Sequence, residues 1–309
     1  MRIATLEYQG ARRVGRISTD GQQIELLDIE ARRGALDLIE ASAAGAPMPV
    51  VAGRVALADV RLLAPLPRPR RNLFCVGRNY HAHAKELRDS VFKDNAPEAW
   101  PIVFTKVPET VVGPGDVVRL PGAHISEQID YEAELTVVIG RGGRNIARAD
   151  AVKHVYGYTI VNDVTARDVQ MRHAQWDLGK SFDTFCPMGP WIVTADELDG
   201  SDTRVQCWVN GELRQDARTT DLIFDIPTLI ETCSRGITLH PGDVIATGTP
   251  AGVGMGFMRG PRRRSGSESR RCRRWRCAPR RHAPASAAAS CPCRRRPACR
   301  WRSRRRAAA

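Results

Sequence analysis

The sequence predicts an α+β fold in which β-strands predominate. Between residues 72 and 248, seven segments have the length of strands and are rich in β-branched and aromatic residues, whereas two segments indicate helices. Turn-forming residues separate the strand segments, and Asn210-Gly211 has the composition of a two-residue hairpin. The strand segments are 72–77, 101–106, 134–140, 155–161, 190–195, 204–211 and 243–248.

The chain divides into four parts. Residues 1–63 alternate short apolar runs with glycine turns, add a helical stretch around 35–44, and predict a small N-terminal domain. The proline-rich segment 64–71 predicts a linker. Residues 72–258 predict the main domain, with one helix after His83 and one around 224–234. Residues 259–309 form a tail of different composition.

The tail holds all of the excess positive charge. The formal net charge of the chain is +13, yet residues 1–258 carry 28 of its 47 basic groups and 33 of its 34 acidic groups. The tail has 19 arginines and no Leu, Ile, Val, Phe, Tyr or Lys, so it has nothing with which to build a core. We therefore predict that it is disordered.

Three interpretations of the tail compete. One is a basic arm for nucleic acid or acidic membranes. Another is a zinc site from Cys291, Cys293, Cys299 and His282, although their spacing fits none of the usual patterns. The third, which we favour, is a GC-rich gene read out of frame, because Arg, Ala, Pro, Gly, Ser, Cys and Trp are the residues that GC-rich codons then yield. A Val/Ile/Glu-rich strand pattern in another frame after codon 258 would support it.

The rest of the chain predicts a soluble, cytoplasmic protein. It has no run of 18 or more apolar residues, and its first residues alternate like a strand rather than like a signal peptide. Four cysteines lie outside the tail, with no spacing typical of a metal site, and we expect them to be reduced thiols.

Two glutamates one pleat apart are the strongest chemical signal. In DYEAELTVVIG at 130–140, Glu132 and Glu134 point to the same face of a strand, and the alternate residues from Ala133 to Ile139 are apolar. Two carboxylates this close repel each other unless a cation lies between them, and Mg²⁺ and Mn²⁺ prefer oxygen ligands. Taken alone, the pattern equally fits a solvated edge strand with surface glutamates.

A second segment adds a third acid and several polar groups. Asp163 follows the predicted strand 155–161 as a candidate metal ligand, beside Arg167 and Gln170 on a helix-like turn. Lys180 has aromatic neighbours in the sequence, which predict a partly buried setting where a lysine needs a charged partner.

A histidine–carboxylate pair and a glycine-rich loop complete the set. If a helix includes His83 and Glu86, the two share a face, and a carboxylate beside an imidazole raises its basicity, as the activation of water requires. The loop TGTPAGVGMG at 247–256 lacks the Gly-Lys-Ser/Thr of a phosphate loop. We expect its N–H groups and the Thr249 hydroxyl to face an anionic oxygen.

Together these motifs resemble the catalytic domain of the fumarylacetoacetate hydrolase family. The segments NYHAHAKEL, DYEAELTVVIG, NDVTARDVQ, LGKSFDTFCPMGPW and PGDVIATGTPAGVG follow the family's order over about residues 72–257, and residues 1–63 resemble the small N-terminal domain of many members. The resemblance implies a mixed, mostly β roll-like catalytic domain, usually dimeric, that binds Mg²⁺ or Mn²⁺. Where members continue with closing strands, this chain has the arginine-rich tail.

The resemblance also implies roles for individual residues. The implied metal ligands are Glu132, Glu134 and Asp163. The implied catalytic groups are His83, Glu86 and Lys180, and the implied substrate-binding groups are Arg167, Gln170 and Thr249.

The implied chemistry concerns small acidic keto or enol compounds. A cation stabilises an enolate, His83 and Glu86 deprotonate water, and Lys180 offsets negative charge. We therefore predict a metal-dependent hydrolase that cleaves a C–C bond in an acylpyruvate-type acid (fumarylpyruvate or a fumarylacetoacetate-like compound) in the catabolism of aromatic compounds. The alternative is an isomerase, decarboxylase or lyase acting on a related 2-oxo dicarboxylic acid. A basic nucleic-acid-binding protein is the rival from another class. We expect a homodimer, and neither a specific nucleic acid nor a membrane as partner.

Overall fold

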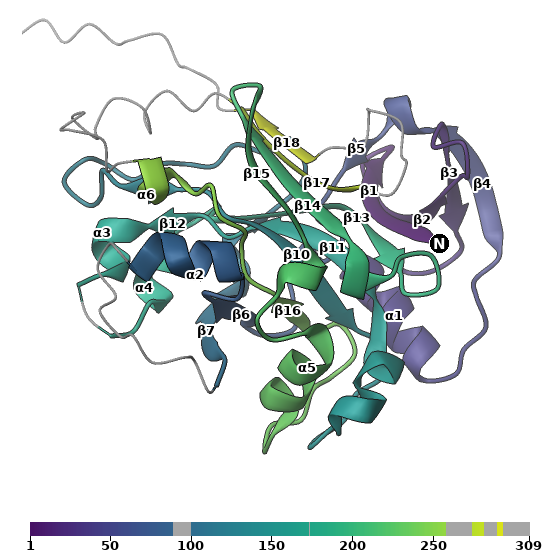
Figure 1. The fold of residues 1–309 in the computed structure, drawn as a ribbon. Helices are drawn as coiled ribbons and strands as arrows, with labels where there is room; N and C mark the ends of the chain where they lie inside the picture. Colours follow the sequence, from purple (N-terminus) through teal and green to yellow (C-terminus); the bar gives the residue numbers. More distant parts are fainter. Residues whose placement is uncertain (89–99, 173, 258–273, 281–288, 293–309) are drawn as a thin grey trace, which may run out of the picture.

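The computed structural model describes residues 1–88, 100–172, 174–257, 274–280 and 289–292, and strands predominate in it, as predicted (Figure 1). The α-helices are α1 (Ala35–Ala43), α2 (His81–Arg88), α3 (Arg167–Gln170), α4 (Asp177–Lys180), α5 (Ile226–Ser234) and α6 (Gly254–Phe257). The strands are β1 (Arg2–Tyr8), β2 (Ala11–Ile17), β3 (Gln23–Leu27), β4 (Val51–Ala56), β5 (Arg61–Leu62), β6 (Leu73–Gly77), β7 (Ile102–Lys106), β8 (Val111–Val112), β9 (Ile129–Asp130), β10 (Ala133–Ile139), β11 (Val155–Asn162), β12 (Thr165–Ala166), β13 (Cys186–Thr194), β14 (Arg204–Val209), β15 (Glu212–Arg218), β16 (Val244–Ala246), β17 (Arg274–Arg280) and β18 (Ala289–Pro292).

A large mixed sheet runs through the molecule. Among the described residues it has 12 strands in the order β4-β3-β2-β1-β13-β11-β10-β16-β6-β7, with β5 paired to β1 and β8 to β13. Most neighbours are antiparallel, and β16 with β6 and β13 with β8 are parallel. Strands β10 and β11 lie in the middle of this order, and they pair with each other along their length.

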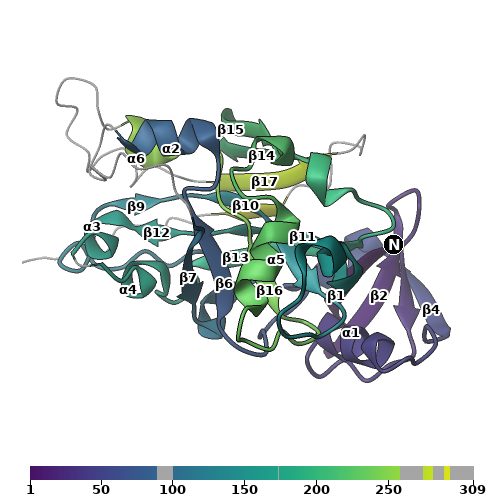
Figure 2. The same cartoon turned by 60° about the horizontal axis from the view of Figure 1, so that its bottom comes forward.

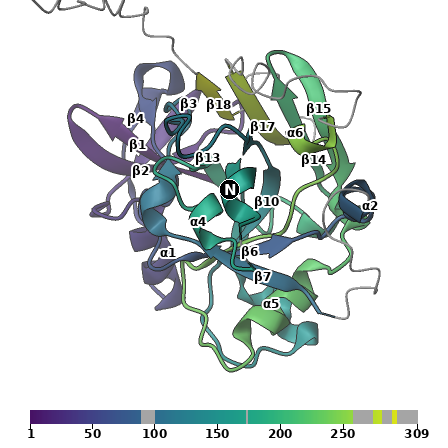
Figure 3. The same ribbon diagram turned by 90° about the vertical axis from the view of Figure 1, so that its left-hand side faces the viewer.

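The N-terminal strands belong to this same sheet. β1 pairs with β13, Arg2 opposite Val193, and the purple strands β1–β4 form one end of the molecule with α1 beside them (Figures 2 and 3). The segment 64–71 is irregular, as its prolines predict, but it is packed: Leu66 is buried, and Thr5 Oγ1 donates to the Pro65 carbonyl at 2.7 Å. The predicted domain boundaries at 63 and 71 stay predictions.

A four-stranded sheet lies against the large one. Its order is β15-β14-β17-β18, and β14, β17 and β18 lie against β10, β11 and β13 respectively (Figure 1). The predicted hairpin joins β14 to β15: Asn210 and Gly211 have φ of 54° and 90°. Both values are positive, as a two-residue turn that matches the twist of its strands requires.

Two strands of this second sheet come from the arginine-rich tail. β17 pairs antiparallel with β14, from Arg204 opposite Arg280 to Val209 opposite Trp275, and β18 pairs with β17. These two segments are strands where composition predicted disorder, because backbone N–H and C=O groups pair whatever side chains they carry. The rest of the tail, including most of the zinc candidates, lies outside the described residues, so the predicted disorder and loss of frame stay predictions there.

The interior is built around β10. Alternate residues Ala133, Leu135, Val137 and Ile139 pack into one apolar cluster, while Val138 packs into a second cluster with residues of α1 and β13. Every residue of β10 is buried, which excludes the solvated edge strand that the sequence left open. In the described part of the chain, no helix has the length and apolar character needed to cross a membrane.

Candidate metal centre and active site

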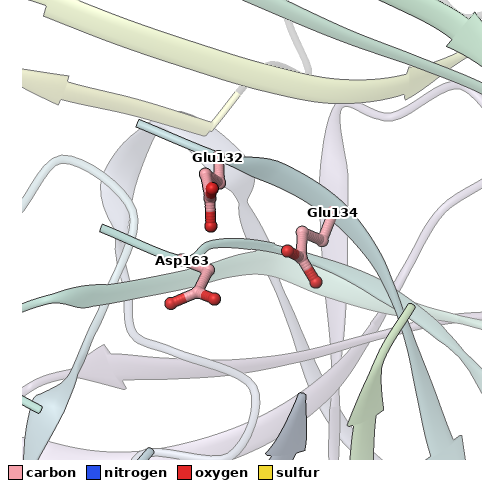
Figure 4. Close-up of side chains that lie close together, drawn as sticks. All are labelled: Glu132, Glu134 and Asp163. Carbon is pink, nitrogen blue, oxygen red and sulfur yellow. The ribbon is translucent and has the colours of Figure 1, made fainter. Parts of the chain in front are cut away.

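Three buried carboxylates converge where β10 and β11 meet. Glu132 directly precedes β10, Glu134 lies in it, and Asp163 directly follows β11. The register places Ala133 opposite Asn162, and the Asp163 N–H donates to the Glu132 carbonyl at 2.8 Å. One oxygen of each carboxylate lies within 4.8 Å of the others (Figure 4). The structure therefore brings together the three predicted metal ligands.

Two buried lysines surround this carboxylate triad. Lys180 Nζ donates to Glu132 Oε2 at 2.6 Å and to Asp163 Oδ2 at 2.7 Å, so the predicted charged partner of Lys180 is the triad itself. Its ammonium lies 4.7 Å from the centroid of the Phe104 ring. Lys106, for which the sequence carries no signal, places Nζ 2.8 Å from Asp163 Oδ1 and donates to the carbonyls of Val164 and Lys180.

The two glutamates differ in their electrostatic setting. Burial by itself raises the pKa of Glu132, but the charges of Arg167 and Lys180 outweigh it, and the net pKa is well below the usual range. For Glu134, burial raises the pKa strongly, and the carboxylates of Asp163 and Glu132 raise it further. The Gly248 N–H donates to Glu134 at 2.9 Å and opposes this only partly. Mutual repulsion within the triad is therefore incompletely offset by protein groups.

The triad fits a divalent cation. Three carboxylates are the oxygen ligands that Mg²⁺ and Mn²⁺ prefer. The Asp163 Oδ1 atom is buried and accepts no hydrogen bond, because its contact with Lys106 at 2.8 Å is an ion pair without hydrogen-bond geometry. Lys106 already places positive charge beside this oxygen, so the indication of a further cation comes from Glu134, whose raised pKa reflects repulsion by Asp163 and Glu132.

Arg167 is held from three sides. It begins α3, directly after the short strand β12, and its Nε donates to Asp130 Oδ2 at 2.9 Å. Its Nη1 donates to Gln170 Oε1 at 3.1 Å, and its Nη2 forms an ion pair with Glu132. Asp130 also accepts from the backbone N–H of Gly254 at 2.7 Å. Nothing in the sequence near Asp130 indicates this role, yet Asp130 links Arg167 to the first turn of α6.

The predicted histidine–carboxylate pair is formed. His83 Nδ1 lies 3.0 Å from Glu86 Oε2 on α2, and His83 is 3% exposed. The backbone N–H of Gly252 lies 3.4 Å from both Glu86 oxygens, which connects α2 to the glycine-rich loop beside α6 (Figures 1 and 2). A carboxylate that is itself hydrogen-bonded fixes the orientation and the tautomer of its imidazole partner.

The glycine-rich loop serves the site differently from the expectation. The N–H groups of Gly248 and Gly252 donate to Glu134 and Glu86, which are anions of the protein itself. The Thr249 hydroxyl donates to the Ala133 carbonyl at 3.1 Å. The loop thus anchors the acidic side chains and the strand that carries them.

One pocket joins these groups. Of the nine predicted site residues seven line it, Glu132 and Glu134 among them. The other two contact lining residues: Asp163 through Lys180, and Glu86 through His83. The space between these side chains, with its open mouth included, is about 340 Å³. The lining residues are Val76, Gly77, Arg78, His83, Phe104, Glu132, Glu134, Arg167, Gln170, Trp176, Lys180 and Thr249.

An aromatic wall closes one side of this pocket. The rings of Trp176 and Phe104 have their centroids 5.2 Å apart. A Cβ atom at Gly77 would lie 2.4 Å from the Trp176 ring, so the close approach of this wall to β6 requires glycine there. Nothing in the sequence around Trp176 or Phe104 indicates that these residues line a pocket and are not ordinary core residues.

The buried charge of Lys106 gives a first prediction. Replacing Lys106 by methionine is expected to lower the free energy of unfolding by about 3–5 kcal/mol, because Asp163 would lose one of its two buried ammonium partners. Denaturant unfolding of metal-free protein measures this. Lys153→Met is the control, since Lys153 forms an exposed pair with Asp150 and should change stability by less than about 0.5 kcal/mol. Equal effects of the two substitutions would contradict the role given to Lys106.

Comparison with known proteins agrees with this geometry. The family model for the C-terminal domain of fumarylacetoacetate hydrolase matches residues 72–278, which include every predicted site residue. The chain belongs to the fumarylacetoacetate hydrolase family. The match confirms the resemblance drawn from the motifs, and it extends into β17.

Curated relatives of this family member include tautomerases. The chain is 52% identical over 202 residues to the oxaloacetate tautomerase YisK of Bacillus subtilis, covering 65% of this chain and 65% of YisK. It is 46% identical over 200 residues to the human mitochondrial oxaloacetate tautomerase FAHD2A, covering 64% of this chain and 61% of that protein. The match thus spans less than two thirds of the length of these relatives.

Solved structures of the family cover more of the chain. A fumarylacetoacetate hydrolase from Exiguobacterium antarcticum has a TM-score of 0.75 and 37% identity, over 96% of this chain and 100% of that one. A maleylpyruvate hydrolase from Sphingobium, in complex with manganese(II) and pyruvate, has a TM-score of 0.68 and 30% identity, over 95% and 98%. A 2-hydroxyhepta-2,4-diene-1,7-dioate isomerase from Mycobacterium marinum has a TM-score of 0.71 and 30% identity, over 95% and 98%. Proteins named as hydrolases and as isomerases therefore share this fold.

Proposed function

We propose that this protein is a divalent-metal-dependent tautomerase that interconverts the keto and enol forms of oxaloacetate or a closely similar 2-oxo dicarboxylic acid. One observation carries the proposal: His83, paired with Glu86, lines the same pocket as Glu132, Glu134 and Lys180. A group that can transfer a proton, His83, and carboxylates that can bind a cation, Glu132 and Glu134, thus line the same pocket.

The reaction moves a proton between the carbon next to the keto group and the keto oxygen. When bound, Mg²⁺ or Mn²⁺ held by the triad would stabilise negative charge on that oxygen and on the adjacent carboxylate. His83 lies in the pocket as the group that removes or returns the carbon-bound proton, and Glu86 holds its ring and stabilises its charged form. Lys180 and Arg167 surround Glu132 and add positive charge where the substrate becomes more negative.

Hydrolysis of a C–C bond, the first expectation from the sequence, is the second candidate. The same His83–Glu86 pair is suited to activate water. The likeness to the maleylpyruvate hydrolase, at 30% sequence identity, supports hydrolysis. The likeness to the tautomerase YisK is closer in sequence, at 52% identity over 202 residues, and supports tautomerisation. The predicted homodimer stays a prediction.

An assay of the purified chain tests the proposal. With Mg²⁺ or Mn²⁺, the enol form of oxaloacetate should convert to the keto form faster than in a protein-free control, as the loss of ultraviolet absorbance of the conjugated enol reports. In D₂O, NMR should show faster exchange of the carbon-bound protons next to the keto group. A panel of acylpyruvates, assayed for released pyruvate, separates the two candidates. Pyruvate release without enol conversion would replace the tautomerase by the hydrolase, and full activity with a chelator present would contradict both.

A further inference from the structure

Next to the metal ligands, strand β10 is paired with β11 on one side but has no strand on the other. On its β16 side the pairing ends at Thr136 opposite Ala246, because β16 is short. Leu135 and Ala133 are paired with β11 but have no strand on their β16 side, although both residues are fully buried. Buried backbone groups need other partners.

Side chains and the glycine-rich loop take the place of that strand. Thr247 donates to the Leu135 carbonyl through its N–H at 3.0 Å and through its hydroxyl at 2.9 Å. Thr249 Oγ1 donates to the Ala133 carbonyl. The Ala133 N–H, between Glu132 and Glu134, donates to Gln215 Oε1 at 3.0 Å.

The side-chain amide of Gln215 forms hydrogen bonds through both its oxygen and its nitrogen. It lies on β15, the outer strand of the four-stranded sheet, and its residue exposure is 0%. While its Oε1 accepts from Ala133, its Nε2 donates to Thr249 Oγ1 at 2.7 Å and to the Pro250 carbonyl at 2.8 Å. One amide therefore connects the strand of the carboxylates to the glycine-rich loop that anchors Glu134 and Glu86.

We propose that Gln215 is a positioning residue: its amide holds Glu132 and Glu134 at the spacing that cation binding requires, and holds the loop that supports the His83–Glu86 pair. This rests on the proposed function. Glutamine suits the position because it presents an acceptor and two donors in one plane. A methionine of the same length would fill the space and make none of the three hydrogen bonds.

The test compares Gln215→Met with Gln206→Met. Gln206 is also a buried glutamine, one residue along β14 from the partner of Gln215, but its Nε2 donates to Asp216, away from the site. Mn²⁺ affinity, measured by electron paramagnetic resonance of the free ion, should fall about 10- to 100-fold for Gln215→Met, as for other groups that orient metal ligands, and less than about threefold for Gln206→Met. Equal Mn²⁺ affinities of Gln215→Met and wild type would overturn the proposal.

Two further measurements keep the test independent of turnover. In metal-free protein, amide hydrogen exchange in peptides covering 129–139 and 247–253 should be faster in Gln215→Met than in Gln206→Met. Should Gln215→Met not fold, Gln215→Glu carries the test: it keeps the acceptor for Ala133 but loses donors to the loop. Its exchange should then increase in 247–253 more than in 129–139, and unchanged exchange in both would overturn the proposal. If the wild-type protein does not turn over oxaloacetate, the proposed function is wrong. The comparison of amide hydrogen exchange would still decide the role of Gln215, because it uses metal-free protein and no substrate.

Discussion

Glu132→Gln or Glu134→Gln is expected to abolish metal-dependent turnover and the thermal stabilisation by metal together. Each substitution removes one of three carboxylates that converge within 4.8 Å, and an uncharged amide is a weaker ligand for a hard cation. Stabilisation by a ligand follows its concentration relative to its dissociation constant, and is about 2.7 kcal/mol at 100 times that constant. Thermal unfolding with a series of Mg²⁺ and Mn²⁺ concentrations, beside the enol conversion assay, measures both effects.

The control is Glu109→Gln. Glu109 is an exposed partner of Arg68, so its substitution should change neither the metal-dependent shift nor turnover. Full activity of Glu132→Gln in the presence of a chelator would show that the triad is not a metal centre. In that case Glu132 would be a structural partner of Lys180 and Arg167 only.

His83→Ala is expected to lower turnover by about 10²- to 10⁴-fold, the usual contribution of a positioned acid–base group. The variant should still bind oxalate, which resembles an enolate, with nearly unchanged affinity, because the triad, Lys180 and Arg167 remain. Steady-state kinetics and calorimetric titration of oxalate in the presence of Mn²⁺ separate these two effects.

His81→Ala is the matched control for this variant. His81 lies on the same helix but is exposed, and its loss should leave both measurements unchanged. An equal loss of oxalate binding and turnover in His83→Ala would make His83 a structural residue of the site. Unchanged turnover would show that the reaction does not use this imidazole.

Local sequence patterns were sufficient for much of the fold and for the centre of the site. The period-2 pattern of β10 placed Glu132 and Glu134 on one face, and the i, i+3 spacing on α2 paired His83 with Glu86. These relations depend on one element each. Asp163 could be proposed as a ligand for a similar reason, because it directly follows a strand that is recognisable in the sequence.

Residues whose role depends on tertiary pairing could not be found in this way. Lys106 meets Asp163 although β7 is four strands from β11 in the order of the sheet, and nothing near Lys106 in the sequence indicates that contact. Gln215 is 82 residues from Ala133, to which it is hydrogen-bonded. The pairing of β1 with β13 could not be predicted either, because it joins residues 191 positions apart, Arg2 and Val193.

In the tail, amino-acid composition alone did not predict the strands. Its lack of aliphatic residues predicts that it forms no core of its own, but this composition says nothing about an open strand edge nearby. β17 pairs along β14 through its backbone, and Pro279, which has no N–H to give, lies beyond the part of β17 that β18 covers. Whether the coding frame changes after residue 258 is decided by the gene and not by this pairing.

The four-stranded sheet therefore tolerates mutation very differently at its two sides. Along β14, the bonds to β17 involve main-chain atoms, so many sequences that avoid proline at the bonded positions would satisfy the same edge. At β15, the connection to the carboxylate strand is a single side-chain amide whose three bonds only glutamine makes at that length. Sequence drift can accumulate on the first side without loss of the fold, whereas on the second side a single codon change reaches the active site.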